Sequence, residues 1–267
     1  MVLKSFPAPW RLKEIGDKLR VNPGLVPGFF TMANMFCGFY SAVLASQGRF
    51  MVASWLIVAA AIWDTLDGKL ARFTGSTSSF GEQYDSMADV ISFGLAPSML
   101  AYFVFFNVWG TTGVFLSFIP LVFASIRLAR FNLRIGESSP GYFEGLPSPS
   151  AAVAVATFVM FNFEFWDKLR FSKVFLTVMV LVALLMISNI RYEKMPRFSI
   201  RSDRANRIKI IMMVVSVTLL LLLQEIAFFP LVAGYILWGP LRILYLSLSG
   251  NGEGEDPEPE EGDREEG

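Results

Sequence analysis

The sequence predicts an all-α integral membrane protein, and three observations support this fold class. Hydrophobic residues make up 54% of the 267 residues, and the mean hydropathy of +0.50 is well above that of an ordinary soluble domain. The apolar residues gather in windows of about 20 residues, which is the length of a helix that crosses a bilayer. Basic residues are concentrated in alternate segments between these windows, as the positive-inside rule describes.

The first expected element is a short amphipathic helix over residues 7–20. Helical spacing places Leu12, Ile15 and Leu19 on one face and basic residues on the others. A helix of this kind lies in the membrane interface, with Trp10 at the depth of the lipid headgroups. Residues 1–24 are therefore expected to form an N-terminal cytoplasmic segment.

About eight transmembrane helices are expected within a membrane domain at residues 25–248. Their windows are 29–47, 50–70, 86–106, 112–130, 149–165, 173–190, 208–224 and 226–247. The boundary between the last two windows is open, because only Gln224 and Glu225 separate two apolar stretches. In the alternative, Pro230 is part of a re-entrant turn. Residues 249–267 are rich in Gly, Pro and acidic residues, so we expect a disordered acidic tail there.

The charge distribution predicts a multi-pass membrane protein with both termini in the cytoplasm, and we expect it in the cell (inner) membrane. Most Lys and Arg residues fall in the segments that this orientation places inside, whereas Arg49, Lys168, Arg170 and Lys173 fall outside. The net charge is zero, but nine acidic residues lie within residues 253–267, so the membrane domain itself is basic. This excess is expected to face anionic membrane lipids, and nucleic acid is not an expected partner.

The sequence contains no histidine and a single cysteine, Cys37. The absence of histidine excludes every mechanism that uses imidazole as a base, nucleophile or metal ligand. Cys37 lies in an apolar stretch and is expected to be a small packing residue. Carboxylates, lysines, tyrosines and metal-bound groups are left to carry any chemistry.

Four aspartates near two helix ends form the most informative pattern. The signature D-x-x-D-G-x-x-A-R, eight residues, G-x-x-x-D-x-x-x-D comprises Asp64, Asp67, Gly68, Ala71, Arg72, Gly81, Asp85 and Asp89. Spacings of three and four place each pair of aspartates on one helix face, and the polar residues between the pairs predict a short turn that brings the two faces together. Ionised carboxylates at a membrane edge need compensation, and divalent cations with oxygen ligands provide it.

The signature resembles that of the CDP-alcohol phosphotransferase family at all eight positions. Other segments resemble the bacterial and archaeal phosphatidylserine synthase branch of that family: NMFCG at 34–38, ADVISFGLAPS at 88–98, RLARFN at 127–132 and FEGLPSP at 143–149. The resemblance implies a six-helix catalytic core that transfers a phosphatidyl group from CDP-diacylglycerol to the hydroxyl of L-serine and releases CMP. It also implies a homodimer.

The resemblance further implies roles for residues of the signature. Two divalent cations, Mg2+ or Mn2+, are expected between the aspartates and the diphosphate of CDP-diacylglycerol. The expected metal ligands are Asp64, Asp67, Asp85 and Asp89, and Asp89 is also the expected general base for the serine hydroxyl. The expected CDP site consists of Gly68, Ala71, Arg72, Gly81 and Asn34, with packing between helices as the alternative role of Asn34.

The carboxylate of serine needs cationic partners if it is buried near phosphate. The cytoplasmic end of the fourth window offers Arg127, Arg130 and Arg134, of which Arg130 is the first choice, and Ser148 is expected to shape the pocket. The arginines fit a purely topological role equally well, because cytoplasmic helix ends collect arginine.

Three other functions fit parts of the pattern less well. Another acceptor, such as glycerol 3-phosphate or inositol phosphate, brings a phosphate dianion and demands a denser group of cations. An intramembrane aspartyl protease shares the pair Tyr84-Asp85, but its partner sequence G-x-G-D is missing. An ion or solute carrier predicts charges near the middle of the bilayer, whereas these aspartates are expected at one edge.

Overall fold

The structure is a computed structural model that describes residues 25–74, 79–133, 142–166, 170–193 and 226–242, with Tyr245 and Leu248. The amphipathic helix predicted over residues 7–20, the window 208–224 and the acidic tail 249–267 lie outside them.

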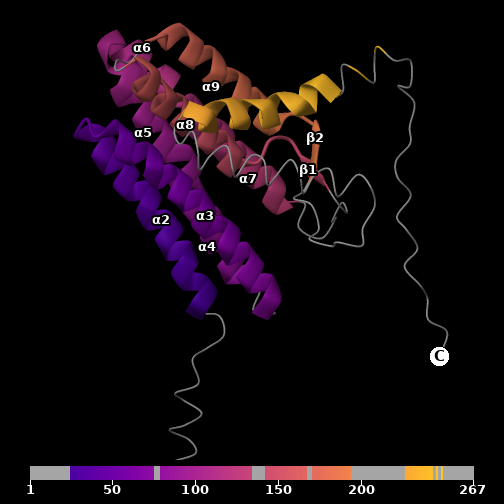
Figure 1. Ribbon diagram of the computed structural model, residues 1–267. Coiled ribbons are helices and arrows are strands. Elements are labelled where there is room, and N and C mark those ends of the chain that lie inside the picture. The colour runs from indigo at the N-terminus through magenta and orange to yellow at the C-terminus, as the bar shows by residue number, and fades with distance from the viewer. Residues whose placement is uncertain are drawn as a thin grey trace, which may run out of the picture.

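The described chain is helical apart from two short strands, which the sequence did not predict (Figure 1). The long helices are α2 (Leu25–Ser46), α3 (Phe50–Thr74), α7 (Ile119–Leu133), α8 (Ser148–Trp166) and α9 (Ser172–Ile187). Between α3 and α7 lie α4 (Ser79–Asp89), η1 (Val90–Leu95), α5 (Ala96–Ala101), η2 (Tyr102–Phe106), η3 (Asn107–Trp109) and α6 (Gly110–Ser117). The strands are β1 (Tyr142–Glu144) and β2 (Arg191–Glu193), and a last helix spans Ile226–Arg242.

Four helical runs of the described chain are long and apolar enough to cross a membrane. They are Gly28–Ser46, Phe50–Ala71, Phe80–Leu133 and Ser148–Trp166, while Ser172–Ile187 and Ile226–Arg242 are shorter apolar helices. The run Phe80–Leu133 reverses near Gly110, whose φ is +56°. Its two arms lie side by side, because the backbone N–H of Leu121 in α7 donates a hydrogen bond to Oγ of Ser98 in α5 (3.1 Å). The predicted windows 86–106 and 112–130 correspond to these two arms.

A widened helical turn precedes Pro97 in the first of these arms. Residues Val90–Leu95 form a π-helical turn in which the N–H of Ala96 bonds to the carbonyl of Ile91. Proline has no N–H, and in an α-helix its ring clashes with the carbonyl four residues earlier, so a wider turn accommodates it. This turn begins directly after Asp89 and therefore affects how the acidic face of α4 is oriented relative to the rest of the span.

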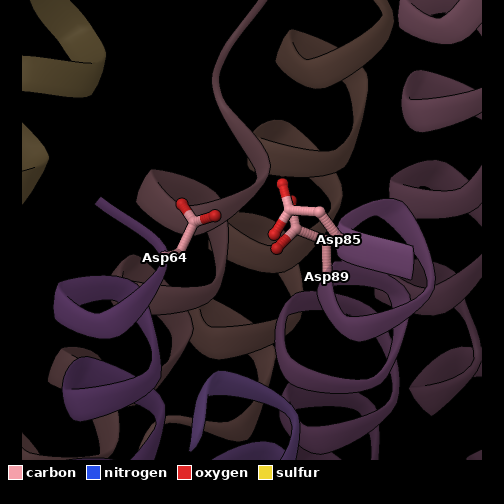
Figure 2. Close-up of side chains that lie close together, drawn as sticks. All are labelled: Asp64, Asp85 and Asp89. Atoms are coloured by element: carbon pink, nitrogen blue, oxygen red, sulfur yellow. The ribbon is translucent and has the colours of Figure 1, made fainter. Parts of the chain in front are cut away.

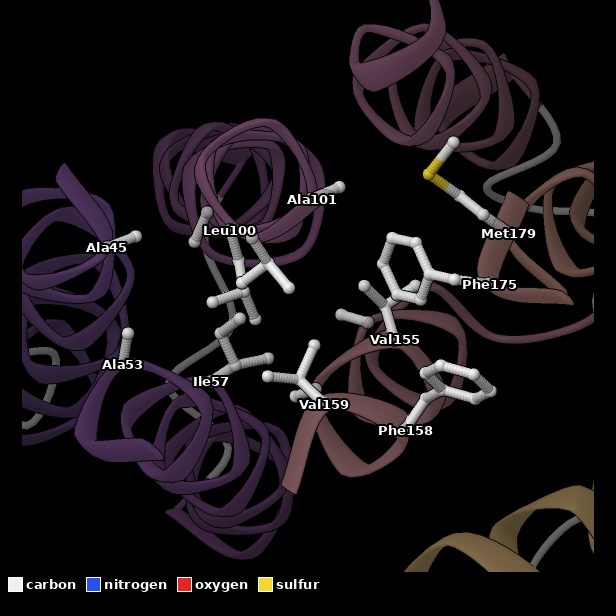
Figure 3. Close-up of a cluster of buried hydrophobic side chains, with 14 of the residues drawn as sticks. Ala45, Ala53, Ile57, Leu100, Ala101, Val155, Phe158, Val159, Phe175 and Met179 are labelled. Atoms are coloured by element: carbon white, nitrogen blue, oxygen red, sulfur yellow. The ribbon is translucent and has the colours of Figure 1, made fainter. Parts of the chain in front are cut away.

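The apolar core lies where α2, α3, α5, α8 and α9 meet. Figure 3 shows the side chains of Ile57, Leu100 and Val159 pointing toward one another from three of these helices, and all three are fully buried. Small residues such as Ala45 and Ala53, which are also fully buried, let α2 and α3 approach closely, as is usual for helices that pack within a membrane.

The closest approach between α2 and η1 occurs at Gly38. A Cβ atom at this position would lie 2.5 Å from both Cα and Oγ of Ser92. Oγ of Ser92 in turn donates a hydrogen bond to the backbone carbonyl of Asn34 (2.9 Å). The absence of a side chain at position 38 therefore fixes the distance between α2 and the span that carries Asp89.

We expect Gly38→Ala to destabilise the protein by about 1–3 kcal/mol, the usual cost of inserting a methyl group into a well-packed interior. The added Cβ must push α2 away from the backbone of Ser92. Thermal unfolding in detergent measures this effect. Gly28→Ala in the same helix is the matched control, because a Cβ there meets no atom of the described structure within 4 Å. Equal melting temperatures for the two variants would contradict the prediction.

The two strands connect the beginning of α8 with the end of α9. β1 pairs antiparallel with β2, and Phe143 lies opposite Tyr192. Gly145 follows β1 with a φ of +73°, and its N–H donates a hydrogen bond to the carbonyl of Ile190 (2.8 Å). This conformation favours glycine, and the pairing holds Ser148, the first residue of α8, near the end of α9.

The helix Ile226–Arg242 packs against α8 and β2. The ring of Phe229 lies edge to face with that of Phe158 in α8, with 5.1 Å between the ring centroids. The hydroxyl of Tyr192 in β2 donates a hydrogen bond to the carbonyl of Ile236 (3.1 Å). Burial, followed by the neighbouring Tyr235, raises the pKa of Tyr192 to about 12, so this hydroxyl keeps its proton and remains a donor.

Candidate active site

Three of the four predicted aspartates converge at one end of the helical bundle. Asp64 lies near the end of α3, and Asp85 and Asp89 lie one turn apart on α4. One carboxylate oxygen from each lies within 4.8 Å of the others, and Figure 2 shows Asp64 facing the other two across the gap between the helices. The spacing of four residues places Asp85 and Asp89 on one face of α4, and this face meets Asp64 of α3.

Asp67 lies outside this group of three. It is buried, with 5% of its surface exposed, and its Oδ2 accepts a hydrogen bond from the hydroxyl of Thr31 in α2. Its Oδ1 is buried without a hydrogen-bond partner among the described residues. Asp67 therefore lies beside the group of three and interacts electrostatically with Asp64 and Asp85.

The three clustered carboxylates fit a divalent cation. Two carboxylates at this separation repel each other by on the order of 3 kcal/mol at an effective dielectric constant of about 20. Within the described chain, Oδ1 of Asp85 is buried and has no hydrogen-bond partner. Oxygen atoms of this kind are the preferred ligands of Mg2+ and related hard cations. A cation bound here would remove the repulsion and satisfy the unpaired oxygen.

Two polar side chains of α2 donate hydrogen bonds to the aspartates. The fully buried Asn34 donates a hydrogen bond from Nδ2 to Oδ1 of Asp89 (3.1 Å), and Thr31, one turn earlier, bonds to Asp67. Asn34 was predicted in the CDP site, and its observed partner is the carboxylate of Asp89. Thr31 was not predicted, although its spacing of three from Asn34 would have placed both on one helix face.

The predicted CDP-binding residues lie around the same end of α3 and α4. Gly68 and Gly81 are exposed, and Ala71 is half-buried. Arg72 belongs to α3, and its side chain lies outside the described part of the structure. The assignment of these four residues to a nucleotide site remains a prediction.

The predicted arginines have different surroundings. Arg127 donates a hydrogen bond from a terminal nitrogen to Oγ of Ser148 (2.7 Å) and interacts electrostatically with Asp89 and Asp64. Arg130 instead donates to the carbonyl of Ile187 (2.6 Å) and to Oδ1 of Asn189 (3.2 Å) at the end of α9. Arg134 lies outside the described residues. Arg127 and Arg130 are the two predicted acceptor-site arginines that the structure describes, and Arg127 is the one that interacts with the aspartates.

Tyr235 is a further polar residue near Arg127 that the sequence did not indicate. Its side chain is hydrogen-bonded to that of Ser150 and interacts electrostatically with Arg127. The helix that carries Tyr235 was predicted only as an apolar span, and its contact with the site depends on tertiary packing that the sequence pattern does not reveal.

Comparison with known proteins shows the family of the chain. The family model for CDP-alcohol phosphatidyltransferase matches residues 24–186, more than half of the chain. The chain belongs to this family. All four aspartates, Asn34 and the pair Arg127–Ser148 lie within the matched residues, whereas Tyr235 lies beyond them.

Curated relatives of this CDP-alcohol phosphatidyltransferase come from bacteria and archaea. A CDP-diacylglycerol–serine O-phosphatidyltransferase of Helicobacter pylori is 38% identical over 86% of this chain and 95% of its own length. An archaetidylserine synthase of Methanothermobacter thermautotrophicus is 34% identical over 67% of this chain and 74% of its own length. A CDP-diacylglycerol–serine O-phosphatidyltransferase of Methanocaldococcus jannaschii is 32% identical over 64% of this chain and 75% of its own length.

Proposed function

We propose that this chain is a CDP-diacylglycerol–serine O-phosphatidyltransferase of phospholipid biosynthesis. It transfers the phosphatidyl group of CDP-diacylglycerol to the hydroxyl of L-serine, giving phosphatidylserine and CMP. The observation that carries the proposal is the cluster of Asp64, Asp85 and Asp89 within a chain that matches the Helicobacter pylori enzyme along 95% of that enzyme's length.

The aspartates and the neighbouring small residues form the donor site. Asp64, Asp85 and Asp89 would hold two divalent cations, Mg2+ or Mn2+, and Asp67 would support the site from beside the cluster. When bound, such ions clamp phosphoryl oxygens and neutralise the charge that develops on the leaving group. Gly68, Ala71 and Gly81 leave room for the nucleotide, and Arg72 binds a phosphate through charge-assisted hydrogen bonds.

Asp89 acts as the general base. It accepts the proton of the serine hydroxyl while the serine oxygen bonds to phosphorus and the bond from phosphorus to the CMP oxygen breaks. The hydrogen bond from Asn34 to Oδ1 of Asp89 supports this role, because it holds the carboxylate in one orientation. The backbone carbonyl of Asn34 accepts a hydrogen bond from Ser92, so α2 is also held against the span that carries this base.

Arg127 is the best candidate to bind the carboxylate of serine. Its guanidinium lies near Asp89 and Asp64, and its Nε is buried without a hydrogen-bond partner among the described residues. Arg130 was the first choice from the sequence, but two of its nitrogens already bond to the end of α9, where a cation stabilises the last carbonyls of a helix. Ser148 orients Arg127 and shapes the pocket.

We place the site at the cytoplasmic face of a chain with eight transmembrane helices, an N-terminal interfacial helix and both termini inside. The distribution of basic residues supports this orientation. The aspartates lie at the same end of the bundle as Arg127 and Arg130 of α7, which belong to the segments that the positive-inside rule assigns to the cytoplasm. The protein functions as a homodimer surrounded by membrane lipids.

A single assay tests the proposed reaction. Purified protein in detergent is incubated with CDP-diacylglycerol, Mg2+ or Mn2+, and one candidate alcohol at a time, and released CMP is measured. We expect CMP release that depends on L-serine and stops when a chelator is added. Release only with glycerol 3-phosphate or inositol phosphate would contradict serine as the acceptor and leave the donor chemistry intact. No release with any alcohol would contradict the enzymatic proposal altogether.

A further inference from the structure

The helix Ile226–Arg242 is held in a defined position beside the site. Tyr192 of β2 bonds to the carbonyl of Ile236 (3.1 Å), and its ring faces Gly239, where a Cβ would lie 2.8 Å from the ring. Ile236 is buried and packs with Leu146, the residue that follows Gly145. These contacts fix the rotation of the helix and so the direction in which Tyr235 projects.

Tyr235 projects toward the beginning of α8 and the guanidinium of Arg127. Its ring centroid lies 5.9 Å from that of Tyr192, and its side chain is hydrogen-bonded to that of Ser150, two residues after Ser148. Ser148 accepts the hydrogen bond of Arg127. Arg127, Ser148, Ser150 and Tyr235 therefore form one group of interacting polar side chains near Asp64 and Asp89, in which Ser148 is fully buried. Tyr235 is 42% exposed, so part of its side chain is accessible to a ligand.

We propose that Tyr235 binds the amino-acid acceptor, its phenol donating a hydrogen bond to the carboxylate that also pairs with Arg127. This inference rests on the proposed function, and it adds a residue from beyond the matched residues 24–186 to the acceptor pocket.

The charge of the polar group around Arg127 favours an amino-acid acceptor. A carboxylate carries one negative charge, which a single guanidinium balances, and neutral hydroxyls add hydrogen bonds without adding charge. A phosphorylated alcohol carries nearly two charges and would leave one of them unbalanced beside Asp64 and Asp89. Tyr235 would therefore contribute to the choice between amino-acid and phosphorylated acceptors, which the aspartates alone do not make.

Tyr235→Phe tests the proposal, because it removes the hydroxyl and keeps the ring that packs on Tyr192. We expect the KM for L-serine to rise about 10- to 100-fold, the usual effect of losing a hydrogen bond to a charged group. The KM for CDP-diacylglycerol should stay within two-fold of the wild-type value, and so should kcat. The inhibition constant of O-methyl-L-serine, which keeps the carboxylate but lacks a reactive hydroxyl, should rise in parallel with the KM for serine.

Tyr40→Phe is the matched control, because Tyr40 lies on the exposed face of α2 and stacks on Phe36. An unchanged KM for serine in Tyr235→Phe would overturn the inference, and so would a fall in kcat together with a rise in both KM values, which indicates a structural defect. If the wild-type protein releases CMP with serine, either of these two results overturns only the role proposed for Tyr235. Absence of serine-dependent CMP release in the wild type would instead overturn the proposed function.

Discussion

Asp89→Asn is expected to lower serine-dependent CMP release by about 1,000-fold, within the range attributed to general bases. The amide has nearly the same shape as the carboxylate, and its oxygen can still accept the hydrogen bond that Asn34 donates to Oδ1 of Asp89. It cannot accept a proton from the serine hydroxyl, and it brings no negative charge to the cluster with Asp64 and Asp85. The variant should therefore fold normally and fail in the chemical step.

Turnover and nucleotide binding are measured separately to check this expectation. Calorimetry in the presence of Mn2+ measures binding of CDP to the purified variant, and we expect this binding to be retained. CMP release by the same variant should fall to near background. Glu164→Gln is the matched control, because Glu164 is an exposed carboxylate in α8 toward the other end of that helix from Ser148. Turnover near the wild-type rate in Asp89→Asn would remove the assignment of Asp89 as the base.

Helical spacing predicted which residues share a face, but it did not predict what that face meets. Asp85 and Asp89 share a face and converge with Asp64, as the sequence indicated. Arg127 and Arg130 also lie three apart on α7, yet Arg127 reaches Ser148 and Arg130 reaches the end of α9. The difference depends on where α9 ends relative to α7, which is a tertiary property that no local pattern contains.

Seven of the eight hydrophobic windows coincide with helices of the described chain, and the window 208–224 lies outside it. The windows did not predict irregularities within these helices. The window 86–106 was predicted as one helix, and it forms one arm of a hairpin with π-helical turns at Val90–Leu95 and Tyr102–Phe106. Pro97 in the sequence could have indicated a disturbed helix. The β1–β2 pairing gave no comparable indication, because each strand has three residues and they come from distant parts of the chain.

Asp67 has surroundings that differ from those of the other three aspartates. The resemblance implied that it is a metal ligand, and that assignment remains a prediction. The hydroxyl of Thr31 bonds to its carboxylate, and the three clustered oxygens come from Asp64, Asp85 and Asp89. The four aspartates are therefore expected to contribute unequally to metal binding, and this inequality can be measured.

Asp85→Asn is expected to raise the Mn2+ concentration for half-maximal activity by at least about 100-fold. The effect of Asp67→Asn is expected to be smaller, about 10-fold, the low end of the range for groups that act on a metal through its ligands. Asp85 contributes an oxygen to the cluster of three and has an unpaired buried oxygen, so its removal takes away a direct ligand. Asp67 keeps Thr31 as its partner and lies beside the cluster.

The two variants are compared in one titration of chelator-treated protein with Mn2+. Activity gives the half-activating concentration, and the electron paramagnetic resonance signal of free Mn2+ gives binding without any turnover. Thr31→Val removes the hydroxyl that bonds to Asp67. It should raise the half-activating Mn2+ concentration as Asp67→Asn does, but by a smaller factor. An Asp67→Asn variant that loses metal as completely as Asp85→Asn would place all four carboxylates in the first coordination sphere. It would also show that α2 and α3 rearrange when the cation binds.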